Sequence, residues 1–173
     1  MTIVECEVPA ASVLTRSVVQ AAYFKDSYRA PLLHRQASMV DIFFSIFGHN
    51  PWWIKRVLIA RNVVAGLCGL DVPSAHAVLN PEIKRQYQVG ETIGVWPIFA
   101  LTSHELVAGR NNKHLDFRLS ILRESDNGTE RVVVSTICTV HNRAGKVYLF
   151  FVVPFHRWGV KRLIQRAIDA DRL

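Results

Sequence analysis

The sequence predicts an α+β protein in which an antiparallel sheet of about five to seven strands packs on a long C-terminal helix. Residues 91–141 alternate between apolar and polar side chains, with turn residues between the alternating runs, as in a β-meander. Residues 142–173 follow helical spacing instead. The chain has 173 residues and is 50% hydrophobic, so we expect a single domain, 1–173, with its own core.

The first predicted strand is Tyr23–Leu32, because residues 1–22 show no firm period. Side chains alternate along a strand, so Asp26 shares a face with the aromatic residues Phe24 and Tyr28. A buried carboxylate requires partners. The simpler interpretation is therefore that this face is only half buried, or that Asp26 bonds backbone groups at a sheet edge.

Two helices are predicted after this strand. The first spans Ser38–Phe47, with Ser38 as N-cap and Asp41 at the third helical position. The second begins at Asn50, has Pro51 at its first position and ends near Gly69. Residues 71–90 contain two prolines and several polar residues, which is typical of a long connection.

Four further strands form the predicted meander, and a proline in the first of them indicates an edge strand. They are Val95–Thr102, Glu105–Arg110, Lys113–Glu124 and Glu130–His141.

The dipeptide Asn127–Gly128 favours a two-residue hairpin turn between the last two strands. Such a turn pairs Asp126 with Thr129, and the same register extends along both strands. One face is then apolar and should meet the core; its residues on the third strand are Leu115, Phe117, Leu119 and Ile121. The other face collects the polar side chains of His114, Asp116, Arg118, Thr139 and His141.

Three interpretations of this polar face compete. An antiparallel sheet commonly exposes one face to water, and this is the favoured interpretation. Alternatively, Asp116 orients one of the histidines His114 and His141 so that the imidazole acts as a general base. A metal site is the least favoured interpretation, because only these three ligands are evident.

The C-terminal helix should extend from Asn142, its N-cap, to Leu173, with a kink at Pro154. Its first half, VYLFFVVPF, is apolar all round and is expected to be buried. Its second half is amphipathic. The side that faces the sheet is predicted to carry Leu149, Val153, His156, Val160, Leu163 and Ala167.

The net charge is +7 and the isoelectric point is about 9.7, which suits nucleic acid, an anionic membrane or an acidic ligand. The chain has no recognised nucleic-acid motif, so that partner is not expected. The basic stretch Arg157–Arg166 is compatible with peripheral membrane contact, although a solvated face is the commoner explanation. A homodimer is also compatible with the sequence.

Three widely spaced cysteines, without a CxxC pair, indicate neither a disulfide framework nor a zinc site. The sequence lacks a signal peptide pattern and a long apolar span, so a cytoplasmic location is expected. The motifs GxGxxG, GxxxxGK[ST], HExxH and GxSxG do not occur, and no cofactor is predicted.

Four stretches occur in order: DSYRAPL, PWWIKRVLIARNVV, NKHLDFRLSI and HNRAGKVYLFFVVPFHRWGVKRLI. With them the chain resembles the bacterial domain-of-unknown-function family 2867 from about Tyr23 to Ala167. That family stands alone or follows an NAD-binding domain, and no activity is established for it. The element order also resembles the helix-grip (START-like, Bet v 1-like) architecture, although fewer strands are predicted here. The resemblance marks as motif members His114, Asp116, Arg118, His141, Asn142, Arg143, Pro154, His156 and Arg157.

The favoured function is a module that binds a small apolar or amphipathic ligand in a pocket between the sheet and the C-terminal helix. The predicted ligand-binding residues are Asp26, Tyr28, Trp96, Phe99, Arg118, Phe151, Phe155 and His156. The alternative is an acid–base enzyme, such as a cyclase, isomerase or hydrolase. Its predicted catalytic residues are His114, Asp116 and His141.

Overall fold

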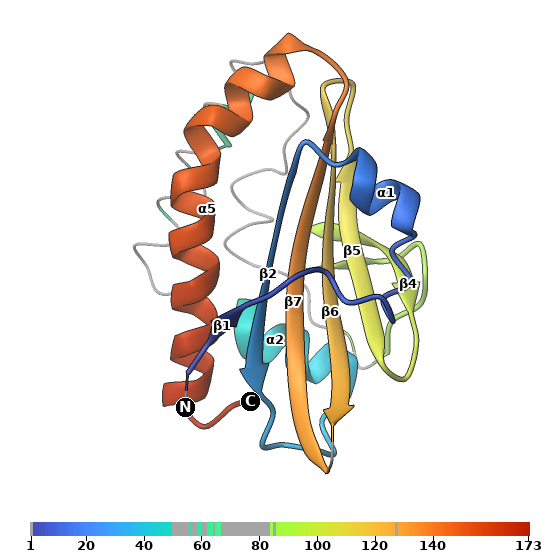
Figure 1. Cartoon of the computed structure of the whole chain (residues 1–173), viewed down its shortest axis with the longest axis vertical. Helices are drawn as coiled ribbons and strands as arrows, with labels where there is room; N and C mark the ends of the chain where they lie inside the picture. The colour runs from blue at the N-terminus through green and yellow to red at the C-terminus, as the bar shows by residue number, and fades with distance from the viewer. Residues whose placement is uncertain are drawn as a thin grey trace.

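The computed structural model of the chain describes residues 2–49, 56, 59, 62–63, 65–66, 84, 86–126 and 128–173. These residues form a seven-stranded antiparallel sheet with a long helix, α5, along one face (Figure 1), which confirms the predicted fold class. The strand order is β1-β2-β7-β6-β5-β4-β3. The strands are β1 (Val4–Glu5), β2 (Phe24–Pro31), β3 (Thr92–Ile93), β4 (Trp96–Leu101), β5 (Glu105–Asn111), β6 (Leu115–Asp126) and β7 (Thr129–Val140). The described helices are α1 (Arg16–Ala21), α2 (Met39–Phe47) and α5 (Arg143–Asp169).

The predicted register of the long hairpin is confirmed. Strands β6 and β7 pair from Asp126 with Thr129 to Leu115 with Val140, as the Asn-Gly turn requires. The backbone N–H of His141 then donates to the carbonyl of His114, 2.9 Å away, so the pairing continues one step beyond the strand ends. Strand β2 lies on the other side of β7.

Two of the three predicted helix starts are also confirmed. Ser38 caps α2, and its side chain and that of Asp41 form a reciprocal capping box. Asn142 caps α5 by accepting a hydrogen bond from the N–H of Gly145. The predicted helix from Asn50 to Gly69 lies largely outside the described residues, but those that are described there are helical.

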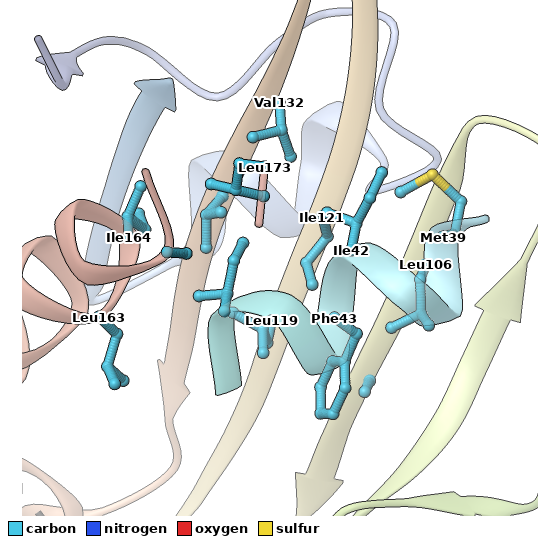
Figure 2. Close-up of a cluster of buried hydrophobic side chains, with 14 of the residues drawn as sticks. Met39, Ile42, Phe43, Leu106, Leu119, Ile121, Val132, Leu163, Ile164 and Leu173 are labelled. Atoms are coloured by element: carbon cyan, nitrogen blue, oxygen red, sulfur yellow. The ribbon is translucent and has the colours of Figure 1, made fainter. Parts of the chain in front are cut away.

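The main core lies between the sheet, α2 and the second half of α5. Ile164 of α5, Phe43 of α2 and the β6 residues Leu119 and Ile121 belong to this core, and Figure 2 shows Ile164 and Phe43 on opposite sides of Leu119. Leu119 and Ile121 belong to the face that the sequence predicted to be buried. A smaller cluster packs the first half of α5 on the same face; its buried members are Phe24, Ala65, Leu115, Cys138, Tyr148 and Leu149.

The opposite face of the sheet is not simply exposed to water. Figure 1 shows the N-terminal segment crossing the sheet between β1 and α1. The carboxylate of Glu105 is buried there and accepts hydrogen bonds from the hydroxyls of Ser12 and Ser120, each 2.6 Å away. It also accepts one from the N–H of Val13 at 2.6 Å. Polar side chains therefore bind the N-terminal segment to this face, for which the sequence showed no periodic signal.

The prediction that the first half of α5 is buried is wrong. The side chains of Phe150, Phe151 and Phe155 are 76%, 57% and 69% exposed. The sheet contacts only one side of the helix, along the predicted stripe that includes Leu149 and Val160. The helix continues through Pro154, and Figure 1 shows its N-terminal part inclined to the rest. None of the helices within the described residues is long and apolar enough to span a bilayer.

Candidate functional site

A buried polar cluster lies between the sheet and the middle of α5. We call it the Asp26 cluster; its members are Asp26 and Tyr28 of β2, Thr136 of β7 and His156 of α5. Asp26 is paired directly with Thr136, and Tyr28 lies two residues further along the same face. His156 points to the sheet, with its Nε2 3.2 Å from Thr136 Oγ1 and 3.5 Å from Asp26 Oδ1.

The surroundings of Asp26 correct the expectation that its face is half buried. The Asp26 side chain is only 1% exposed, and the hydroxyl of Tyr28 donates to its Oδ2 at 3.1 Å. Its Oδ1 accepts no hydrogen bond within the described part of the chain. A buried carboxylate is costly unless its oxygens are satisfied. Asp26 is therefore a buried group with capacity for one more donor.

The cluster interrupts the apolar contact between α5 and the sheet. On one side Tyr148 and Leu149 pack in the smaller hydrophobic cluster, and on the other side Val160 and Ile164 pack in the main core. His156 is intermediate, with 20% of its side chain exposed. The ring therefore connects the buried carboxylate with the solvent.

Aromatic rings and cations surround this polar group. The ring of Phe24 contacts His156 edge-on, with the centroids 5.6 Å apart. The guanidinium of Arg157 lies 5.5 Å from the centroid of Phe24, and the ammonium of Lys161 lies 5.0 Å from that of Tyr28. The site thus combines an apolar wall, one buried negative charge and positive charge at the rim.

Burial raises the pKa of Tyr28 well above its ordinary value, and the charge of Asp26 and the hydrogen bond to it raise it further. Because the folded-state pKa is raised, the unfolded state loses this proton first as the pH rises through about 10. Unfolding then releases a proton, so stability is full below pH 10 and falls above it.

We expect Tyr28→Phe to flatten this decline. Between pH 10 and 11 the free energy of unfolding of the unmodified protein should fall by up to about 1.4 kcal/mol more than that of the variant. Urea denaturation at several pH values measures the difference. Parallel curves above pH 10 would show that Tyr28 ionises equally easily in both states.

The second predicted site is only partly assembled. Asp116 and His141 do meet, with Oδ2 and Nε2 3.2 Å apart, and both side chains are about one-third to two-fifths exposed, at 32% and 41%. His114 instead turns to Asn142, with its Nδ1 3.0 Å from the amide Oδ1. The predicted triad is therefore divided into one partly exposed ion pair and one histidine bound to a helix cap.

His114 belongs to a junction that fixes the start of α5 on the β5–β6 turn. Asn142 donates from Nδ2 to the carbonyl of Lys113 at 3.1 Å, while its Oδ1 accepts from the N–H of Gly145 at 3.3 Å. A Cβ atom on Gly145 would lie 2.4 Å from the carbonyl oxygen of His114. These contacts give a structural role to Lys113 and His114 of the stretch KHLDFR and to Asn142 and Gly145 of the stretch HNRAGK. We call the set His114, Asn142 and Gly145 the α5 junction.

The other predicted ligand-binding residues lie in three separate places. Arg118 stacks its guanidinium on the ring of Phe99, 3.7 Å from the centroid, on the sheet face away from α5. Burial lowers the pKa of Arg118, and Asp116 partly offsets this. Trp96 packs against the α2 aromatics Phe43 and Phe47. The two remaining aromatics, Phe151 and Phe155, are exposed on the outer side of α5.

Thr136 was not predicted as a site residue. It becomes one because β2 pairs with β7, and residues 26 and 136 are too far apart in sequence for any local signal to indicate this. Within the described residues, no group of three or more His, Cys, Asp or Glu side chains is placed to hold a metal ion.

Two shallow grooves lie on the surface, and neither is lined by Asp26, Tyr28, Thr136 or His156, although Lys161 borders the first of them. One, of about 380 Å³, is bordered by Ile3 and Glu5 at the N-terminus and by Trp158 and Arg162 of α5. The other, of about 630 Å³, is bordered by residues 33–37, Ser45 and Arg172.

Comparison with known proteins agrees with the resemblance noted in the sequence. No curated protein and no solved structure matches the chain significantly. One family model does match, over residues 18–163, and its range includes the Asp26 cluster and the α5 junction. The chain therefore belongs to the family described as a protein of unknown function, DUF2867.

Proposed function

We propose that this protein binds a small amphipathic molecule at the Asp26 cluster, between the sheet and the middle of α5. The observation that carries the proposal is the buried Asp26 carboxylate, whose Oδ1 accepts no hydrogen bond from the described residues. A cluster that served packing alone would be replaced at lower cost by apolar side chains. A sheet wrapped on a long helix, as in helix-grip folds, is also an arrangement suited to enclosing such a ligand.

The ligand chemistry follows from the groups around the cluster. A hydroxyl or amide N–H would donate to Asp26 Oδ1, and an apolar portion would pack on Phe24. The partly exposed ring of His156 marks the point of entry. Because Asp26 Oδ1 is buried, a ligand reaches it through a local shift of His156 and the adjoining turn of α5.

Two measurements test this proposal. Mass spectrometry of gently purified protein should find a co-purified amphipathic molecule, and a panel of fluorescent amphiphiles with hydroxyl or amide head groups should include a ligand. Asp26→Asn should weaken its affinity by about 10- to 100-fold, since a hydrogen bond to a charged group contributes about 1.5–3 kcal/mol. Thermal denaturation of each variant establishes that it is folded.

Asp116→Asn is the matched control, because it removes the same charge from the partly exposed pair with His141. Its affinity should equal that of the unmodified protein. Equal loss in both variants would indicate a general charge effect. If the unmodified protein carries no ligand and binds none of the panel, or if Asp26→Asn binds normally, the proposal is wrong.

A further inference from the structure

The outer side of α5 carries a continuous apolar surface, which we call the α5 ridge. It consists of Val147, Phe150, Phe151, Phe155 and Trp158. These side chains are 54–76% exposed. They recur every three or four residues, so they lie on one side of the helix, opposite the stripe that packs on the sheet. Exposed apolar surfaces of this extent mark sites of interaction.

Positive charge brackets the ridge. Arg143 lies one turn before Val147, so it lies on the ridge side at the N-terminal end of the ridge. Lys161 lies near the C-terminal end, but its ammonium is paired with the carboxylate of Glu5, 3.2 Å away, so its charge is not counted with the others. Lys146 and Arg157 lie beside the ridge, and Arg162 follows its C-terminal end; all three are exposed. Residues 143–168 contain no Asp or Glu.

The positive charge around the ridge favours an anionic surface over a second copy of the chain as the partner. Two copies of the chain that met through this helix would bring like charges together on both sides of the contact. An anionic surface would be attracted by the same charges. Phe and Trp side chains with flanking Lys and Arg are typical of helices that lie in the membrane interface. Residues 147–158 span only about 18 Å, too short to cross a bilayer core of about 30 Å.

We propose that the α5 ridge docks the protein on an anionic membrane surface. Helix α5 then lies parallel to the membrane, with the ridge among the acyl chains and the basic side chains at the lipid phosphates. The proposal does not rest on ligand binding at the Asp26 cluster, because the apolar side chains of the ridge lie on the opposite side of the helix. Arg157 borders both surfaces, since its guanidinium also lies 5.5 Å from the centroid of Phe24.

Co-sedimentation with lipid vesicles tests this inference. The protein should bind vesicles of phosphatidylcholine with about 30 mol% phosphatidylglycerol, bind pure phosphatidylcholine at least about tenfold more weakly, and lose affinity as salt is raised. The triple variant Phe150→Ser, Phe151→Ser, Phe155→Ser should bind the anionic vesicles at least about tenfold more weakly. The control is Leu33→Ser with Val89→Ser, which changes exposed apolar residues elsewhere and should bind normally.

A second set of variants tests the contribution of the basic side chains to vesicle binding. Arg143→Gln with Arg162→Gln should also reduce binding at least about tenfold, whereas Arg16→Gln with Lys25→Gln, which removes two exposed charges elsewhere, should reduce it less. Circular dichroism confirms that each variant is folded. If the ridge lies among the acyl chains, brominated lipids should quench the fluorescence of Trp158. The quenching should therefore be weaker in Trp158→Phe.

Three outcomes would overturn the proposal. The first is absence of binding to the anionic vesicles, and the second is binding that does not depend on the anionic lipid. The third is a dimer in analytical ultracentrifugation that the triple variant abolishes, which would assign the α5 ridge to a second copy of the chain.

Discussion

Glu105→Ala is expected to lower the free energy of unfolding by about 3–5 kcal/mol. The carboxylate is buried and accepts three hydrogen bonds of 2.6 Å, from Ser12, Val13 and Ser120. Alanine would leave three donors without an acceptor beneath the N-terminal segment, and each unsatisfied buried donor costs about 1–3 kcal/mol. We also expect the N-terminal segment to lose its attachment to the sheet.

Urea denaturation measures the loss of stability, and hydrogen exchange at the Val13 amide measures the attachment. Glu124→Ala is the control, because Glu124 forms a partly exposed ion pair with Arg29 at 3.1 Å. Such pairs contribute only about 0–1 kcal/mol. Glu105→Gln keeps one acceptor oxygen and should fall between the two. Equal urea midpoints for Glu105→Ala and Glu124→Ala would contradict the role given to Glu105.

The sheet meander could be predicted because its signals are local. The Asn-Gly dipeptide predicted the register in which β6 and β7 pair, and the alternation from Leu115 to Ile121 predicted the buried face. The N-terminal segment could not be predicted, because it is held by contacts of single polar side chains with residues far along the chain. Ser12 and Glu105 are an example: they are 93 positions apart.

The candidate site, too, depends on contacts between residues that are far apart in the sequence. Asp26 and Tyr28 could be recognised as an unusual pair on one strand, and His156 could be placed on the inner stripe of the last helix. Their meeting depends on the pairing of β2 with β7, which brings Thr136 beside Asp26. The predicted pairing of β6 with β7 joined His114 to Asp116 and His141, because the three share one face of the sheet. That pairing did not indicate that the Asn142 side chain would bind His114.

The prediction that the first half of α5 is buried failed for a different reason. A segment that is apolar all round is typical of a buried helix. Burial requires cover on every side, however, and the sheet provides it only along the stripe of Leu149 and His156. The apolar composition of this segment therefore did not decide which of its side chains the sheet would cover, and the outer side chains are exposed.

Two glycines of α5 should respond in opposite ways to alanine. Alanine ordinarily stabilises a helix interior by about 0.5–1 kcal/mol relative to glycine. Gly159 has open space where a Cβ would lie, so Gly159→Ala should show that gain. At Gly145 the Cβ would lie 2.4 Å from the carbonyl oxygen of His114 and 3.0 Å from Val140 Cγ1. Gly145→Ala should therefore destabilise the protein by about 1–3 kcal/mol.

The Gly145→Ala substitution also tests the α5 junction, because its Cβ would contact the backbone of His114. The nearest atom is backbone, so relief requires the first turn of α5 to move away from the β5–β6 turn, which lengthens the contact between His114 and Asn142. Urea denaturation gives the sign of each change, and the NMR shifts of the His114 imidazole should move in Gly145→Ala but not in Gly159→Ala. If both substitutions stabilised the protein, α5 would not be held against His114, and the contacts of Asn142 would be ordinary capping.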